Sequence, residues 1–126
     1  MKGENVATVQ DDQALVRAAH QKLVRLYLRG LELEHHASPA EKAIAATTIR
    51  EVAEAMAEVR ARLVPLGEGW ALFSATVPPV KVSVLWQMNC GTHVDVRAVD
   101  SNGMEMFYTL GQNFFWDLAE AKKVNG

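Results

Sequence analysis

Residues 80–110 decide the fold, and their sequence is VKVSVLWQMNCGTHVDVRAVDSNGMEMFYTL. Apolar side chains recur at every second position along three runs, and mostly polar side chains stand between them. A period of two is the pattern of a strand with one buried face. Turn-forming segments separate the runs. The sequence therefore predicts three antiparallel strands, at about residues 80–88, 93–99 and 104–110.

The alternation also predicts how the last two strands pair. Ala98 opposite Met106 and Val96 opposite Tyr108 keep the apolar side chains on one face. This register leaves Ser101-Asn102-Gly103 as the loop, with Gly103 free to take a positive φ. A two-residue Asn-Gly turn would place apolar residues opposite polar ones.

Two helices are predicted before the strands. Asp11 or Asp12 is a good N-cap for a first helix over about residues 12–34, and Gly30 lies on its apolar stripe, where we expect a close helix contact. Ser38-Pro39-Ala40-Glu41 combines an N-cap, a proline at the first turn and a capping-box glutamate, which predicts a second helix over about residues 39–64. The apolar seam of the second helix has alternating spacings of four and three. Its members are Ala45, Ile49, Val52, Met56, Val59 and Leu63.

The remaining segments complete the predicted fold. Residues 70–76 are expected to form a first strand, which Pro78-Pro79 ends, and Asn113 is the expected N-cap of a closing helix over about residues 113–122. Residues 1–10 are polar and aperiodic, and we expect a disordered arm. The predicted class is α+β, with residues 11–126 forming a single domain: an N-terminal antiparallel helical hairpin packed on a four-stranded antiparallel β-meander with a short C-terminal helix.

Composition sets the broad class of protein. The 126 residues are 49% hydrophobic and 22% charged, which fits one soluble domain. The single cysteine, Cys90, excludes an internal disulfide and favours a reducing compartment, and neither a targeting signal nor a membrane-spanning run is found, so we expect a cytoplasmic protein without membrane contact. A formal charge of −2 gives no overall field that would attract nucleic acid.

The groups that carry chemistry are few. Cys90 and His93 lie in one connection and could supply a nucleophile and a base, or, with His35 and His36, zinc ligands. The ligand spacings of structural zinc sites are absent, and a turn followed by an exposed strand residue explains the same residues. Asp95, Glu105 and Arg97 fit ordinary cross-strand patterning on the solvent face. We therefore expect no catalytic residue, no metal and no cofactor, and an enzyme is the less favoured class.

A basic stripe marks the first helix. Lys22, Arg25 and Arg29 stand at spacings of three and four, which suits contacts with phosphate oxygens. Glutamates follow at once along the chain, and such mixed charge is typical of a solvated face. Nucleic-acid binding is therefore the least favoured function.

Some apolar residues do not fit the predicted core. Leu85 and Phe107 fall on the solvent face of the strands, and three consecutive aromatic residues span too wide an arc of the expected closing helix to enter one core. The interface candidates are accordingly Leu85, Phe107, Phe114, Phe115 and Trp116. Exposed aromatic residues are typical of interface cores.

The predicted function follows from these residues. We expect a small non-enzymatic protein–protein interaction module, such as an adaptor, a chaperone-like protein or an inhibitor of a larger protein machine, that binds a protein partner or a second copy. The alternative is a small-molecule-binding protein or small enzyme, with a pocket between the helical hairpin and the sheet.

Overall fold

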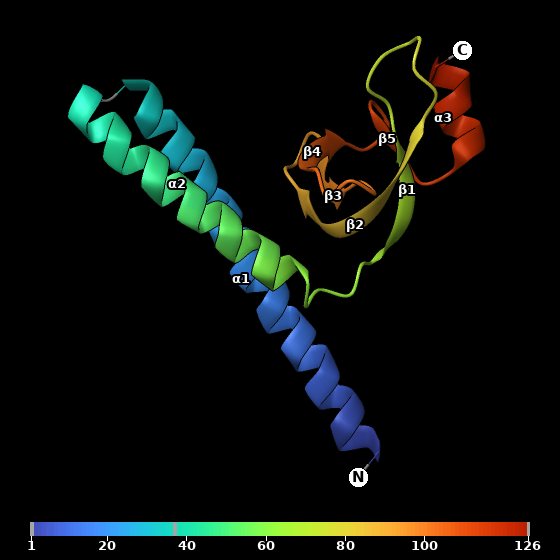
Figure 1. The fold of residues 1–126 in the computed structure, drawn as a ribbon. Coiled ribbons are helices and arrows are strands. Elements are labelled where there is room, and N and C mark those ends of the chain that lie inside the picture. The colour runs from blue at the N-terminus through green and yellow to red at the C-terminus, as the bar shows by residue number, and fades with distance from the viewer. Residues whose placement is uncertain (1, 37, 126) are drawn as a thin grey trace. The chain divides into compact units, whose positions relative to one another are not determined.

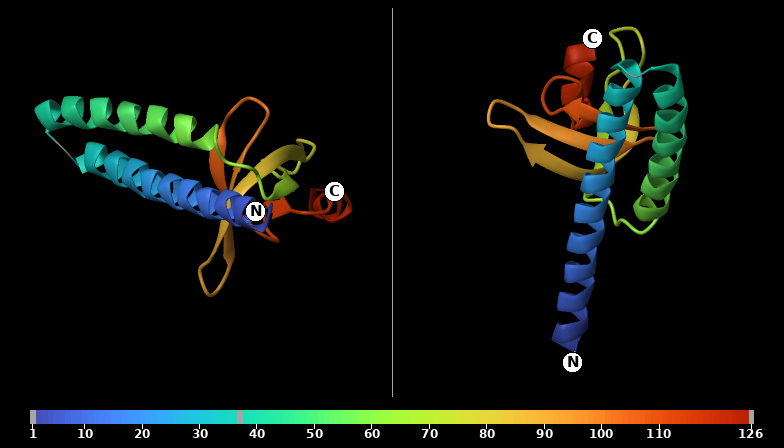
Figure 2. Two further views of the ribbon diagram at one scale, coloured as in Figure 1. Left: turned by 90° about the horizontal axis from the view of Figure 1, so that it is seen from below. Right: turned by 90° about the vertical axis from the view of Figure 1, so that its left-hand side faces the viewer.

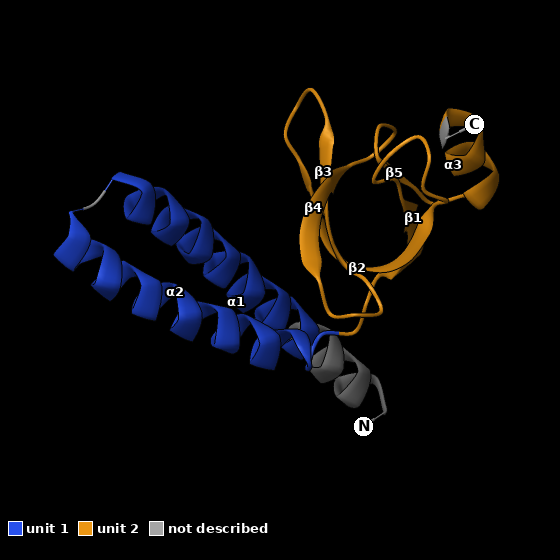
Figure 3. Cartoon of the chain, turned by 45° about the horizontal axis from the view of Figure 1, so that its top comes forward, with its two compact units in different colours: residues 1–63 blue, residues 64–126 orange. Residues whose placement is uncertain are grey.

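The computed structural model describes the backbone of residues 2–36 and 38–125, and the side chains of residues 12–36 and 38–124. The fold is α+β, as predicted (Figure 1). The chain divides into two compact units, residues 1–63 and residues 64–126 (Figure 3). The helical unit holds two helices, and the sheet unit holds five strands and one helix. A single domain over residues 11–126, with the hairpin packed on the sheet, stays a prediction.

The helical unit is the expected antiparallel hairpin. Helix α1 spans Lys2–His36 and helix α2 spans Pro39–Arg60, and the two lie side by side (Figures 1 and 2). Ser38 is the N-cap of α2: its hydroxyl accepts a hydrogen bond from the Glu41 amide and donates one to the Glu41 carboxylate, the reciprocal pair of a capping box. The prediction from Ser38-Pro39-Ala40-Glu41 is confirmed.

The predicted seam is confirmed as the inner face of α2, since its residues from Ala45 to Val59 are buried or half-buried; Leu63 is buried too, but it follows the end of α2 at Arg60. A Cβ added to Gly30 would lie 2.9 Å from Cγ1 of Ile49, so the missing side chain allows the expected close contact. Helix α1 begins at Lys2 rather than near residue 12. The side chains of residues 1–11 lie outside the described residues, and the disordered arm over residues 1–10 stays a prediction.

The sheet unit contains the predicted meander and one further strand. The strands are β1 (Gly67–Ala71), β2 (Val80–Asn89), β3 (Val94–Val99), β4 (Glu105–Thr109) and β5 (Phe114–Phe115). Their order is β4-β3-β2-β1-β5, and every pair is antiparallel. The sheet curls into a half-barrel (Figure 3). Its buried core cluster comprises Ala71, Val82, Val84, Val96, Ala98, Tyr108 and Phe114.

The predicted register of β3 and β4 is confirmed. Ala98 pairs with Met106 and Val96 with Tyr108. Gly103 has a φ of +83°, and the Asp100 carboxylate accepts hydrogen bonds of 2.9 Å from the amides of Asn102 and Met104. Keeping the apolar face continuous was therefore enough to find the loop.

A β-bulge in β2 interrupts the simple alternation of buried and exposed side chains that the sequence predicted. Val84 pairs with Ala98, but Trp86 pairs with Arg97, so Leu85 is the extra residue. Trp86 consequently leaves the core face on which its parity placed it. It packs edge-on against Phe107, with ring centroids 5.5 Å apart.

Strand β1 ends earlier than predicted, because residues after Ala71 turn. The Ser74 hydroxyl accepts hydrogen bonds from the amides of Thr76 and Val77, a local turn that competes with extended pairing. The strand instead begins earlier than predicted and includes Gly67 and Gly69. The ring of Phe114 lies where a Gly69 side chain would stand, so the core needs a glycine in this strand.

The closing helix begins at Leu118, and the prediction of a helix from about residue 113 is wrong at its start. Phe114 and Phe115 are extended and pair with Ala71 and Trp70. Pairing on the edge of β1 buries both rings, a gain that a helix starting at Asn113 would lose. Asn113 does not cap the helix, because its side chain accepts a 2.6 Å hydrogen bond from the Thr109 amide. Helix α3 (Leu118–Asn125) starts after Asp117, which accepts from the Ala119 amide.

Candidate functional site

The predicted aromatic interface divides between buried and exposed residues. Leu85, Phe114 and Phe115 are buried, and Phe107 is half-buried. Trp116 is 41% exposed, and its ring packs edge-on against Phe114 at 5.1 Å between centroids. Phe114 to Trp116 are therefore brought together at the β1 edge, while Leu85 and Phe107 lie on β2 and β4. Their role as an interface stays a prediction.

The face of β3 and β4 that was expected to be solvated is not solvated at Arg97 and Glu105. Their side chains are only 6% and 5% exposed, and Arg97 Nη2 lies 2.6 Å from Glu105 Oε2. The Arg97 guanidinium also stands 4.7 Å above the centroid of the Phe107 ring. A buried and stacked ion pair has a structural role, so the interpretation as ordinary solvent-face patterning was wrong for these two residues.

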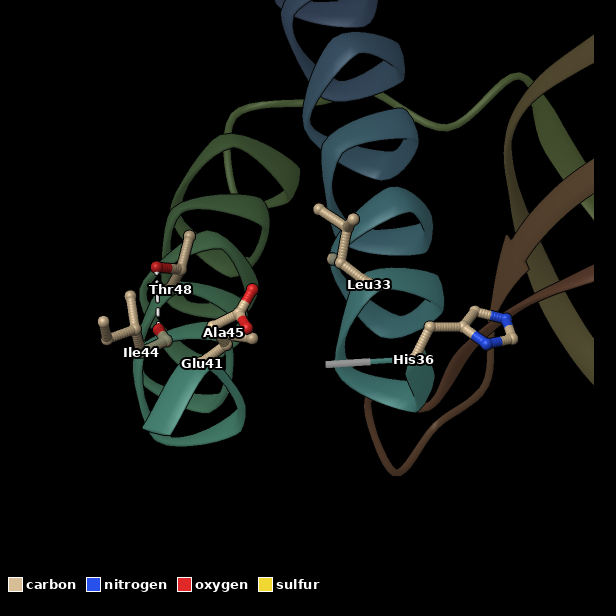
Figure 4. A pocket seen from close by; sticks show the side chains of 7 residues that line it. Leu33, His36, Glu41, Ile44, Ala45 and Thr48 are labelled. Atoms are coloured by element: carbon tan, nitrogen blue, oxygen red, sulfur yellow. Dashed lines mark hydrogen bonds between the residues drawn. The ribbon is translucent and has the colours of Figure 1, made fainter. Parts of the chain in front are cut away.

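The helical unit exposes large apolar side chains around a hollow. A hollow of about 390 Å³ lies between α1 and α2 near their connection (Figure 4). Leu33 from α1 and Ile44 from α2 line it and are 61% and 70% exposed. The remaining lining residues are Gly30, His36, Glu41, Ala45 and Thr48.

This apolar surface continues along α1. Leu15, Leu26 and Leu33 are exposed, and their spacings of eleven and seven residues place them within about 20° of one another around the helix. Leu26 and Leu33 stand at the spacing of a buried helical stripe, but the structure leaves both of them exposed. A single neighbouring helix covers only one arc of α1, and these leucines lie outside that arc.

The two helices carry opposite charge beside this surface. The predicted basic residues Lys22, Arg25 and Arg29 are exposed on α1. Around the helix they border the leucine stripe on its side away from α2. On α2 the corresponding exposed border is acidic, and it consists of Glu51, Glu54 and Glu58. The nucleic-acid function stays a prediction that no further observation favours.

A second cluster lies at the tight turn between β2 and β3. The Cys90 thiol donates to Asp95 Oδ2 at 3.3 Å, and His93 Nε2 lies 3.1 Å from Asp95 Oδ1. The thiol therefore faces the carboxylate and not the imidazole, unlike a nucleophile paired with its base. The hydrogen bond to Asp95, together with partial desolvation and the carboxylate charge, raises the pKa of Cys90 and disfavours the thiolate.

The sequence interpretation considered Cys90 and His93 but missed Asp95 as their neighbour. The signal was available: a two-residue Gly91-Thr92 turn makes Cys90 and His93 cross-strand partners, and Asp95 then lies on their face. The pocket proposed between hairpin and sheet stays a prediction.

No protein-family model matches the chain, and no match was found among curated proteins or solved structures. None of the described helices is long and apolar enough to cross a membrane.

Proposed function

We propose that the protein is a non-enzymatic interaction module whose helical hairpin associates with a second copy. The two hairpins pack through their leucine-bearing faces and form a four-helix bundle. The observation that carries this proposal is the exposure of Leu33 and Ile44 beside the hollow between α1 and α2. Large apolar side chains gathered on one face favour association.

The charge pattern supports a second copy as the partner. Gly30 lies beside Ile49, and Gln13 donates a 3.0 Å hydrogen bond to the Arg62 carbonyl, which sets the stagger of the two antiparallel helices. With this stagger, Lys22 and Arg25 stand at about the heights of Glu54 and Glu51. A two-fold axis parallel to the helices places α1 against α2 of the partner at the same height. The basic border of each chain then meets the acidic border of the other.

The alternative symmetric arrangement is less favourable. If α1 packed against α1 of the second copy, the basic residues of both chains would lie close together. Like charges at an interface are repulsive, and they would leave the acidic borders of α2 without partners. The proposed bundle therefore has α1 and α2 alternating around its axis, as antiparallel neighbours do in four-helix bundles.

The test is the solution mass at several concentrations, measured by light scattering. We expect a concentration-dependent dimer for the wild type. Ile44→Asp places one charge at each of two symmetric positions, and losing about 1.5–3 kcal/mol at each weakens the dimer by more than roughly 100-fold. Leu28→Asp is the matched control, because Leu28 is an exposed leucine of α1 that points away from the leucine stripe.

Charge reversal separates the second copy from other partners. Lys22→Glu with Arg25→Glu should weaken the dimer, and adding Glu51→Lys with Glu54→Lys should restore it. Far-ultraviolet circular dichroism checks that each variant remains helical. A wild type that stays monomeric at all concentrations, or a charge reversal that is not rescued, would refute the proposed dimer.

A further inference from the structure

We propose that Cys90, His93 and Asp95 form a zinc-binding site at the turn between β2 and β3. One donor atom from each of these residues lies within 4.8 Å of the others. Thiolate, imidazole and carboxylate are the three ligand types that zinc takes from proteins. The site lies in the sheet unit, and it is independent of the association proposed for the helical hairpin.

The β-hairpin of β2 and β3 brings the three side chains together. Asn89 pairs with Val94 and Met88 with Asp95, so Cys90 and His93 are the next partners and flank the two-residue turn. The Cys90 amide donates a 2.9 Å hydrogen bond to the His93 carbonyl. Partners across two strands share a face, and residues two apart on one strand share it as well. Asp95 therefore lies on the same face as Cys90 and His93 before any ion binds.

Gly91 makes this turn possible. It has a φ of +89°, which suits the first central position of a two-residue hairpin turn. Its amide donates to the Asn89 side chain at 2.9 Å, which further fixes the loop. The donors are consequently held by a paired backbone.

The distances between donor atoms are close to those around a zinc ion. Zinc–ligand bonds of roughly 2.0–2.3 Å in a tetrahedron separate neighbouring ligand atoms by about 3.3–3.5 Å. Here Cys90 Sγ lies 3.3 Å from Asp95 Oδ2, and His93 Nε2 lies 3.1 Å from Asp95 Oδ1. These two contacts use different oxygens of Asp95, and all three donor atoms lie within 4.8 Å of one another, so rotation of the side chains would bring them around one ion.

Thr92 contacts the ring nitrogen of His93 that faces away from Asp95. Its hydroxyl lies 3.1 Å from His93 Nδ1. When Nδ1 carries the proton and donates it to Thr92 Oγ1, the lone pair of Nε2 is directed toward Asp95 and the ion. Binding of the ion requires the Cys90 thiol to lose its proton to solvent, and the ion then takes the place of that hydrogen bond to the carboxylate.

The ligand set also determines the class of ion. A thiolate and an imidazole favour zinc or a similar transition metal over magnesium or calcium, which prefer oxygen ligands. Cys90 and His93 are exposed, so an ion reaches the site directly from solvent. Three protein ligands leave the fourth position to water, as in open zinc sites.

The test uses the full-length reduced protein, with Zn²⁺ measured by calorimetry and Co²⁺ by absorption. We expect one Zn²⁺ per chain and a thiolate-to-cobalt charge-transfer band in the near ultraviolet. Cys90→Ser should remove that band, and His93→Ala and Asp95→Asn should each weaken Zn²⁺ binding by at least about tenfold. His35→Ala is the matched control, because His35 is an exposed histidine of the helical unit that does not line the hollow.

The site would be overturned by a lack of stoichiometric binding, by binding that survives Cys90→Ser unchanged, or by binding lost in His35→Ala. Tryptophan fluorescence distinguishes loss of ligands from loss of fold, because all three tryptophans (Trp70, Trp86 and Trp116) belong to the sheet unit. Zn²⁺ should also protect Cys90 from alkylation in the wild type, and a rate unchanged by Zn²⁺ would equally refute the site.

Discussion

The helical unit and the sheet unit differ in how much apolar core they bury, since most of the buried apolar side chains belong to the sheet unit. In the sheet unit Phe114 is fully buried, and Phe115 is buried beside it on the edge of β1. In the helical unit Leu33 and Ile44 keep most of their surface exposed. A curled sheet can enclose a core with its own strands, whereas two helices cover only one stripe of each other.

This difference indicates which surface is available to a partner. Most of the aromatic residues that were predicted to form an interface are buried or half-buried inside the sheet unit. Several leucines of α1, by contrast, remain exposed in the helical unit. Apolar character in the sequence therefore says little about exposure until the number of covering elements is known.

The largest expected effect comes from removing one apolar side chain from each unit. Phe114→Ala should cost about 3–5 kcal/mol of the unfolding free energy of the sheet unit, because it empties a fully buried position. Ile44→Ala, measured on dilute monomer, should change the stability of the helical unit by less than about 0.5 kcal/mol. Urea unfolding by tryptophan fluorescence reports the first, and circular dichroism of the helices reports the second. Similar costs would contradict the contrast.

Two glycines give the next largest difference. Gly69→Ala should destabilise the sheet unit by about 2–3 kcal/mol, because its methyl group would collide with the buried Phe114 ring and lie 3.1 Å from the Phe115 carbonyl oxygen. Gly30→Ala places its methyl group 2.9 Å from Cγ1 of the half-buried Ile49, so that side chain must shift, and the preference of alanine for the helix, up to about 1 kcal/mol, offsets part of this cost. We expect the Gly30 variant to lose less than about 1 kcal/mol of stability in the same urea measurements.

A smaller effect concerns the one hydroxyl in the sheet core. Among the described residues, the Tyr108 hydroxyl is buried without a hydrogen-bond partner. Tyr108→Phe should therefore stabilise the sheet unit by about 1 kcal/mol at neutral pH. Tyr27→Phe in the helical unit is the matched control, since the chain has two tyrosines. Equal changes in both variants would argue against a cost at Tyr108.

The same variant predicts a pH dependence. Burial, with a further contribution from the Asp100 charge, raises the pKa of Tyr108. The unfolded phenol ionises near pH 10, while the folded one stays neutral to higher pH. Ionisation of Tyr108 therefore does not affect the unfolding free energy below about pH 10. As the pH rises from there toward the folded pKa, the unfolded state loses its proton first, and the unfolding free energy decreases. Urea unfolding at alkaline pH should show a smaller loss of stability for Tyr108→Phe than for the wild type.

The smallest expected effect is on the reactivity of the exposed Cys90 thiol. Asp95 raises the pKa of Cys90 through a hydrogen bond and its charge. Asp95→Asn should therefore increase the thiolate fraction and speed alkylation of Cys90 severalfold at neutral pH in metal-free protein. Asp100→Asn is the control at the neighbouring hairpin, where the carboxylate binds backbone amides instead. Unchanged alkylation in Asp95→Asn would show that this carboxylate does not govern the thiol.

The candidate sites were predictable in part. Cys90, His93 and the basic residues Lys22 and Arg25 stood out by residue type, but their significance depends on neighbours in space. Asp95 joins the thiol only through the pairing of β2 with β3. The stagger of the helical hairpin places the acidic border of α2 level with the basic residues of α1, and sequence spacing alone does not give this stagger.

Sequence alone predicts the α+β class, the cap of α2 at Ser38, the seam of α2 and the register of β3 with β4. These features follow from local periodicity and from hydrogen bonds between near neighbours along the chain. Tertiary structure alone decided the bulge at Leu85, the glycines of β1 and the extended state of Phe114. Each of these depends on the space and pairing that a distant segment offers, and that outweighs the weak local preference of a few residues.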